Sequence, residues 1–299
     1  MRPAHRSRIT AQISGLSYAC NVWDGGGQTT VILLHGFLDC GLNWQFLVDA
    51  LGDSDWHIVA PDWRGHGDTE WIGRGGYYHF TDYARDLEQI AQRFARNRTV
   101  VVGHSMGAMA LAHWLGSRPE NVDGAVLVEA VGPLPLTADD YPIRLRRWLE
   151  QTNQCGDAQK NKSMPHESAV IERLRTHHPR LDDARIKQMS ANLSRQDDFG
   201  AFHWKFDPLH RTTSPMPSFP AITEAYLAHI QCPLLWVGGA ESPFLRPELD
   251  NWLDHAQNLE KVVLSGVGHM VHTEDPESLA CELTRFEANL EAGSRPKGV

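Results

Sequence analysis

Six short apolar runs recur along the chain, and each of them leads into a polar or glycine-containing segment. Taken with the segments that follow them, these runs span 31–36, 57–67, 99–107, 123–133, 233–239 and 261–269. Continuous apolar runs of this length are typical of strands that are buried on both faces of a parallel sheet. Ahead of them, residues 7–23 alternate weakly between apolar and polar positions and precede three glycines, which predicts a strand pair near the start of the chain.

Helical patterns lie between several of these runs. They span 80–97, 106–120 and 276–292. In the first of them, Leu87, Ile90 and Phe94 recur at the three- and four-residue intervals of an amphipathic helix. Strands that alternate with helices predict βαβ units, so we expect an α/β fold with a mostly parallel central sheet flanked by helices.

The stretch 134–225 interrupts this alternation. It is richer in charged, proline, methionine and aromatic residues, and it shows helical patterns without apolar strands. These patterns span 141–151, 167–178 and 181–193. We predict that residues 1–133 and 226–292 form a core domain, that 134–225 form a helical lid or cap insertion, and that 293–299 form a flexible tail.

Composition narrows the class of protein. Apolar residues make up 41% of the chain and charged residues 22%, which is typical of globular proteins. The formal net charge of −9 argues against a nucleic-acid partner, because binding to phosphates needs a basic face. No apolar leader and no stretch long enough to span a bilayer is visible, so we expect a cytoplasmic protein without membrane insertion. The scattered cysteines predict free thiols, at Cys20, Cys40, Cys155, Cys232 and Cys281.

The sharpest chemical signal is a G-x-S-x-G motif centred on Ser105. The motif runs from Gly103 to Gly107, directly after an apolar run and directly before a helical pattern. A nucleophilic serine in this setting sits on a strained turn between strand and helix, where small neighbours are needed. The start of the helix also directs backbone N–H groups toward developing negative charge. The motif therefore predicts Ser105 as a nucleophile.

A serine hydroxyl needs a base that takes its proton, and two histidines near the end of the chain are candidates. We favour His269, because it directly follows the last apolar run and a glycine, over His272, which lies three residues further on. An oxyanion hole needs two backbone N–H donors. We expect these donors from Met106, after the nucleophile, and from Phe37, in the loop after the first apolar run.

Five motifs follow one another in an order that resembles the α/β-hydrolase superfamily. They are HGFLDCGLNW, PDWRGHGDT, GHSMGAMALAHW, LLWVGGAES and GVGHMVHTEDPE. The resemblance covers most of the chain outside the insertion, and the chain also resembles the small acyl esterases and serine hydrolase-like members of the family. It implies an α/β-hydrolase fold with a helical lid, Ser105 as nucleophile and His269 as base. It also implies Phe37 and Met106 as oxyanion donors.

The acid of the expected triad departs from the usual pattern of this family. In most members the acid follows the strand matched here by LLWVGG, but that position is Ser242, which cannot be anionic. Glu241 lies one residue earlier. Glu129 ends the preceding apolar run, where some relatives carry their acid, and a glutamate there is costly to bury without a partner. We prefer Glu129 and keep Glu241 as the alternative. A purely structural role for Glu129 also stays open.

These residues predict a serine hydrolase that cleaves an ester or thioester of a small hydrophobic substrate through an acyl-enzyme. The same triad also suits carbon–carbon bond or lactone hydrolysis, or acyl transfer, and a ligand-binding protein with little turnover is an alternative of another class. We expect no cofactor and no metal, since His177 and His178 are adjacent rather than at ligand spacing. Aromatic residues of the insertion either line an acyl pocket or pack the insertion onto the core.

Overall fold

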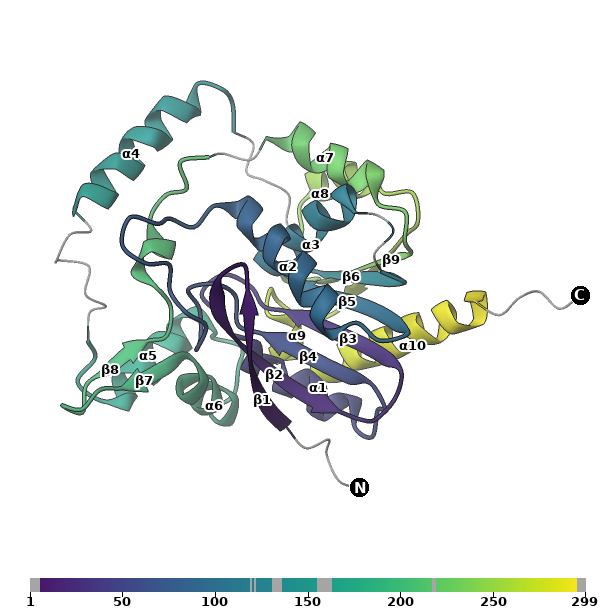
Figure 1. Cartoon of the computed structure of the whole chain (residues 1–299), viewed down its shortest axis with the longest axis horizontal. Helices are drawn as coiled ribbons and strands as arrows, with labels where there is room; N and C mark the ends of the chain where they lie inside the picture. Colours follow the sequence, from purple (N-terminus) through teal and green to yellow (C-terminus); the bar gives the residue numbers. More distant parts are fainter. Residues whose placement is uncertain are drawn as a thin grey trace, which may run out of the picture.

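Eight strands form one sheet through the centre of the molecule (Figure 1). The computed structural model describes residues 6–118, 120, 122–130, 136–154, 163–216 and 219–294. The strands are β1 Arg6–Ile13, β2 Leu16–Asp24, β3 Thr29–Leu34, β4 His57–Pro61, β5 Arg98–His104, β6 Gly124–Val128, β9 Leu234–Gly239 and β10 Leu259–Leu264. Their order is β1-β2-β4-β3-β5-β6-β9-β10. From β4 to β10 all neighbours are parallel, while β1 and β2 extend the sheet in antiparallel pairing.

Helices cover both faces of the sheet. They are α1 Gln45–Leu51, α2 Phe80–Phe94, α3 Met106–Ser117, α7 Pro220–His229, α8 Pro247–Leu253, α9 Val271–Glu274 and α10 Pro276–Ser294. Buried residues of α2, α3, α7 and α8 pack with Ile32 and Leu34 of β3. Those of α1, α9 and α10 pack with Val31 and Leu33. Successive β3 side chains thus enter opposite layers, which is why the strand is apolar at every position.

The order of the strands switches direction between β3 and β5. From β3 the chain passes to β4 on one side of the sheet, and the next strand, β5, returns to the other side of β3. Such a switch in direction leaves a gap outside the carboxyl ends of the two strands, where α/β proteins place their ligands. The segments that follow β3 and β5 carry Phe37 and Ser105, so the fold directs both to this position.

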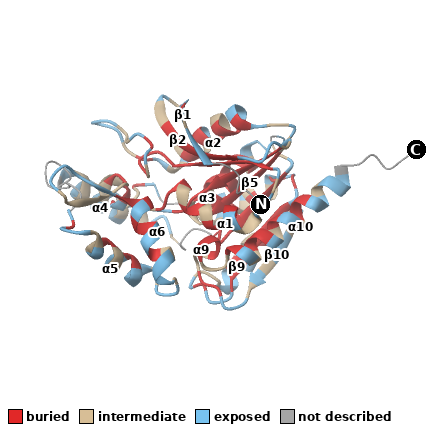
Figure 2. Ribbon diagram, turned by 90° about the horizontal axis from the view of Figure 1, so that it is seen from below, coloured by how far each residue is buried: buried red, intermediate tan, exposed pale blue. Residues whose placement is uncertain are grey.

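The insertion lies at one end of the sheet, on the left in Figures 1 and 2. It contains α4 Asp140–Gln154, α5 Glu167–His177, α6 Asp183–Leu193, β7 Ser194–Gln196, β8 Phe202–Trp204 and the 3-10 helix η3 Pro208–Arg211. Apolar residues of α5 and α6 pack with Cys40 and Phe46, which follow β3, so the insertion rests on the carboxyl ends of the strands. The sequence pattern did not indicate the β7–β8 hairpin, because each of its strands has only three residues.

Several element boundaries differ from the sequence prediction or lie outside the described residues. Helix α7 begins at Pro220, before the predicted return to the core at 226, and packs against α3. Helix α10 continues to Ser294, two residues into the predicted tail. The predicted boundary at residue 133, Cys155 and residues 295–299 lie outside the described residues. The other four cysteines are free. Within the described chain, we find no helix that is both long and apolar enough to cross a membrane.

Candidate active site

Ser105 occupies a strained turn between β5 and α3. Its backbone has φ 50° and ψ −113°, in the left-handed region that residues other than glycine rarely adopt. The turn is held by a hydrogen bond from the Ser105 N–H to the Val128 carbonyl, at 2.9 Å, and by one from the Met109 N–H to the Ser105 carbonyl, at 3.0 Å. Such strain, of order 1–3 kcal/mol, persists where surrounding structure enforces it and is common at functional sites.

The two glycines of the motif are explained by close backbone contacts. A Cβ at Gly103 would lie 2.7 Å from the Ala108 Cα, and a Cβ at Gly107 would lie 2.5 Å from the Leu34 carbonyl oxygen. Both distances are too short for a carbon side chain. The glycines therefore let α3 approach β5 and β3 closely while Ser105 makes the turn.

The loop after β3 lies against the same turn. A Cβ at Gly36 would stand 3.4 Å from the Ser105 Cβ, so the backbone before Phe37 borders the serine directly. His35 anchors this loop to the segment that follows β4, because its Nε2 accepts a hydrogen bond from the Trp63 N–H at 2.8 Å. Burial lowers the pKa of His35 to about 4, which keeps the imidazole neutral and able to accept. Met106 is the first residue of α3, where a backbone N–H has no acceptor within the helix.

His269 and Glu129 lie in hydrogen-bond contact. The His269 Nδ1 is 2.9 Å from the Glu129 Oε2, and the Glu129 side chain is buried. Glu129 also has a positive φ of 52°, just after β6, and its N–H donates to the Val237 carbonyl at 2.8 Å. Two strained residues, Ser105 and Glu129, thus stand at the carboxyl ends of neighbouring strands. The contact orients the His269 ring and fixes its tautomer.

Residues after β9 complete the surroundings of the Glu129 carboxylate. The Gly239 N–H donates to Oε1 at 2.7 Å, and the Ser242 hydroxyl donates to Oε2 at 2.5 Å. Ser242, at the position where the family resemblance places the acid, therefore supports a carboxylate that comes from β6. Glu241 instead pairs with Arg180 of the insertion at 2.8 Å, and its side chain is 53% exposed. The structure brings Glu129 to His269 and directs Glu241 away.

His272, the alternative base, is fully buried beside Asp39. Its Nε2 lies 3.3 Å from the Asp39 Oδ2, and its ring packs on Trp44 with centroids 4.5 Å apart. Burial raises the pKa of Asp39, but the contact with His272 outweighs it, and the net pKa is well below the usual value. His272 thus lies in the interior, whereas the His269 side chain is 22% exposed.

His104 links the nucleophile turn to the histidine loop. Its Nε2 lies 2.9 Å from the His269 carbonyl oxygen and donates to it. Burial, followed by the nearby His272 and His269, keeps the pKa of His104 well below its usual value. Sequence reasoning missed His104 and Asp39 as parts of the site. Their only signal was that each lies inside a motif recognised for another residue.

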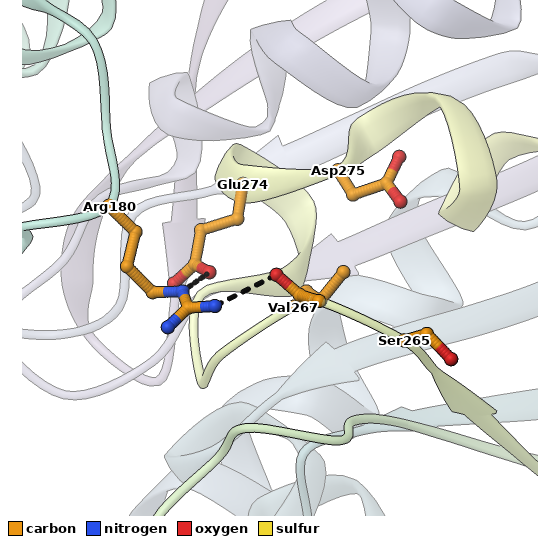
Figure 3. A pocket seen from close by; sticks show the side chains of 6 residues that line it. Arg180, Ser265, Val267, Glu274 and Asp275 are labelled. Carbon is orange, nitrogen blue, oxygen red and sulfur yellow. Dashed lines mark hydrogen bonds and ion pairs between the residues drawn. The ribbon is translucent and has the colours of Figure 1, made fainter.

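A cavity of about 450 Å³ lies at the junction of the insertion with the loop before His269. Its lining is Arg180, Ser265, Gly266, Val267, Glu274 and Asp275. Figure 3 shows the Arg180 side chain extended toward Glu274, with which it pairs at 3.0 Å, and Arg180 also donates to the Gly266 carbonyl at 2.8 Å. This cavity does not include Ser105. Its contacts join the insertion to the histidine loop.

Aromatic residues of the insertion have different surroundings. Phe199 is 96% exposed, and Phe206 is buried and stacked with Trp204. Trp148 of α4 contacts Tyr77 edge to face. Nearer the candidate site, the Phe244 ring lies 4.6 Å from the His269 ring, and Phe37 is 53% exposed. Phe244, beside His269, and the exposed Phe37, in the loop that borders Ser105, thus offer apolar surface from the core loops.

Comparison with known proteins finds the α/β-hydrolase fold family matched over residues 29–276. A serine hydrolase-like protein of Dictyostelium discoideum is 24% identical over 291 residues, which cover 91% of this chain and 79% of that protein. A serine hydrolase-like protein of Danio rerio is 29% identical over 182 residues, or 60% of this chain. That match spans 55% of the Danio rerio protein, about half of its length.

Solved structures share the same architecture. The thioesterase domain from the curacin biosynthetic pathway superposes with a TM-score of 0.82 at 24% identity, covering 94% of this chain and 99% of that chain. An esterase of Mycobacterium tuberculosis gives a TM-score of 0.76 at 20% identity, covering 97% and 93%. At these identities the likeness concerns the fold, and it agrees with the predicted mostly parallel sheet.

Proposed function

This chain belongs to the α/β-hydrolase fold family, and from that premise we propose that it cleaves an ester or thioester of a small hydrophobic substrate through an acyl-enzyme. The observation that carries the proposal is the contact between His269 Nδ1 and the buried Glu129 carboxylate. A histidine held in this way leaves Nε2 to accept a proton, which is the arrangement that activates a serine.

The proposed reaction has two halves. Ser105 Oγ attacks the acyl carbonyl carbon while His269 takes its proton, and the Phe37 and Met106 N–H groups stabilise the oxyanion. The leaving alcohol or thiol receives that proton from His269, and an acyl-Ser105 ester remains. Water then attacks this ester, again with His269 as base, and releases the acid. Glu129 holds the Nδ1 side of His269 throughout and stabilises the imidazolium.

The substrate class rests on the surroundings of the site and on the relatives. Phe37 and Phe244 offer apolar surface beside Ser105 and His269 and suit an acyl group better than a charged one. The names of the structural neighbours, a thioesterase and an esterase, support the same class. The lid role of the insertion and a cytoplasmic location are part of this proposal.

Two measurements together test the proposal. One is labelling with a fluorophosphonate probe, and the other is turnover of p-nitrophenyl butyrate. We expect the wild type to be labelled and active, and Ser105→Ala to lose both while its melting temperature stays within a few degrees. Absence of labelling in a folded wild type would favour a ligand-binding protein. Labelling without turnover of esters and thioesters would favour carbon–carbon or lactone substrates, which a panel of such compounds would identify.

A further inference from the structure

Buried polar atoms next to the Ser105 turn are poorly partnered. The Nδ1 atoms of His104 and His272 have no hydrogen-bond partner, and Asp39 Oδ2 and His272 Nε2 face only each other, at 3.3 Å. The three residues, which we call the Asp39 cluster, are at most 6% exposed. Leaving a buried polar atom unsatisfied costs about 1–3 kcal/mol, and native proteins rarely do so. Several such atoms in one place therefore indicate that something polar or charged binds among them.

The spacing of the Asp39 cluster suits a metal ion. One ligand atom from each residue lies within 4.8 Å of the others, and Asp39 Oδ2 is 3.3 Å from His272 Nε2. Zinc bonds of about 2.0–2.2 Å in tetrahedral geometry separate neighbouring ligands by roughly 3.3–3.5 Å. The Asp39–His272 pair already has this separation.

The hydrogen bond of His104 sets up the correct tautomer for a ligand. Its Nε2 donates to the His269 carbonyl, so its Nδ1 keeps a lone pair and has no other partner. Metal-binding histidines usually donate their second ring nitrogen to a carbonyl or carboxylate in this way. His178 of the insertion is a half-buried histidine whose Nδ1 is also buried without a hydrogen-bond partner.

We propose that the Asp39 cluster is a buried transition-metal site, with Zn²⁺ as its best-matched ion. Two imidazoles and one carboxylate are ligands that zinc and cobalt prefer, whereas Ca²⁺ and Mg²⁺ need more oxygen atoms. This site differs from the sequence expectation of no metal. The three residues come from the loop after β3, the Ser105 turn and α9, so no local spacing indicated them.

A bound dication there also has a consequence that rests on the proposed function. The cluster touches the catalytic histidine, because His104 contacts the His269 carbonyl and the His104 and His269 rings lie 4.8 Å apart. With Asp39 ionised, Zn²⁺ leaves a net positive charge beside His269 and disfavours the imidazolium that acyl transfer needs. Zinc is therefore an inhibitor in this proposal.

Zinc binding to tag-free, EDTA-stripped protein tests the site without any assay of activity. We expect calorimetry to give one tight Zn²⁺ per chain, and Co²⁺ to give the intense visible bands of a tetrahedral complex. Asp39→Asn and His272→Gln should each weaken Zn²⁺ binding by at least about tenfold. His113→Gln is the matched control, since His113 is another buried histidine with an unpartnered nitrogen, and it packs on Tyr226.

Anomalous scattering at the zinc edge from crystals of the wild type locates the ion without relying on variants that fail to fold. A peak among Asp39, His104 and His272 supports the proposal. No tight binding, a peak elsewhere, or only a water in the cluster overturns it. Tight zinc binding by a protein that shows no hydrolase activity even when stripped of metal would support the metal site and refute the proposed function. A stripped enzyme that is active but binds no zinc would refute the metal site and leave the proposed function standing.

Discussion

The segments after β6 and after β9 each carry a glutamate, and the two glutamates differ in burial, backbone conformation and partners. Glu129, after β6, is buried, has a positive φ and accepts hydrogen bonds from Gly239 and Ser242. Glu241, after β9, is mostly exposed and pairs with Arg180. The segment after β9 therefore has a supporting role, because its serine and backbone hold the acid that β6 supplies.

The largest expected effect separates these two carboxylates directly. Glu129→Gln keeps the shape of the side chain and removes its charge, so we expect kcat to fall by about 10³- to 10⁴-fold, the cost of losing the anion behind a catalytic histidine. Glu241→Gln is the matched control and should stay within about twofold. Steady-state turnover of p-nitrophenyl butyrate measures both. Near-full activity in Glu129→Gln, or collapse in Glu241→Gln, would reverse the assignment.

A second variant moves the acid from Glu129 to position 242, where the family resemblance places it. Ser242 already reaches the Glu129 carboxylate, so Ser242→Asp in the Glu129→Gln background should place an anion near His269 and recover at least about tenfold of the lost kcat. Ser242→Asp alone places two carboxylates together and should lower the melting temperature. No recovery in the double variant would show that the position after β9 no longer reaches the histidine.

A smaller effect tests the support that Ser242 provides. Ser242→Ala removes a hydroxyl donor from a buried carboxylate, and we expect unfolding free energy to fall by about 1–3 kcal/mol with a several-fold loss of kcat. Urea denaturation and turnover measure the two quantities. Ser265→Ala is the control, because Ser265 is exposed, and it should change stability by less than about 0.5 kcal/mol. Equal stability of the two variants would contradict the supporting role.

The smallest effect concerns the ion pairs that Arg180 of the insertion makes with Glu241 and Glu274. Arg180→Gln breaks the contacts with Glu241 and Glu274, and because these ions are partly in solvent we expect only a small drop in melting temperature. The difference from wild type should shrink in 1 M NaCl, which screens exposed charges. Differential scanning fluorimetry at both salt concentrations checks this. A drop larger than that of Ser242→Ala would mean that the insertion contributes more to stability than Glu129's surroundings do.

The sequence by itself determined the features that depend on local order along the chain. The apolar runs predicted the parallel strands, because strands buried on both faces are apolar at every position. The fold class is confirmed by the sheet order and by the family match. The turn at Ser105 was also predictable, since the glycines that permit it lie within two residues of the serine. The β7–β8 hairpin was not, because three-residue strands leave almost no periodicity to detect.

Only the tertiary structure decided between the two glutamates and assembled the Asp39 cluster. Glu129 and Glu241 are both near the ends of apolar strands, and sequence spacing does not report which side chain faces His269. That depends on the positive φ of Glu129 and on the pairing of β6 with β9, which brings Gly239 and Ser242 to its carboxylate. Asp39 and His272 are 233 positions apart in the sequence, and their contact exists only because the sheet places both loops at the same edge.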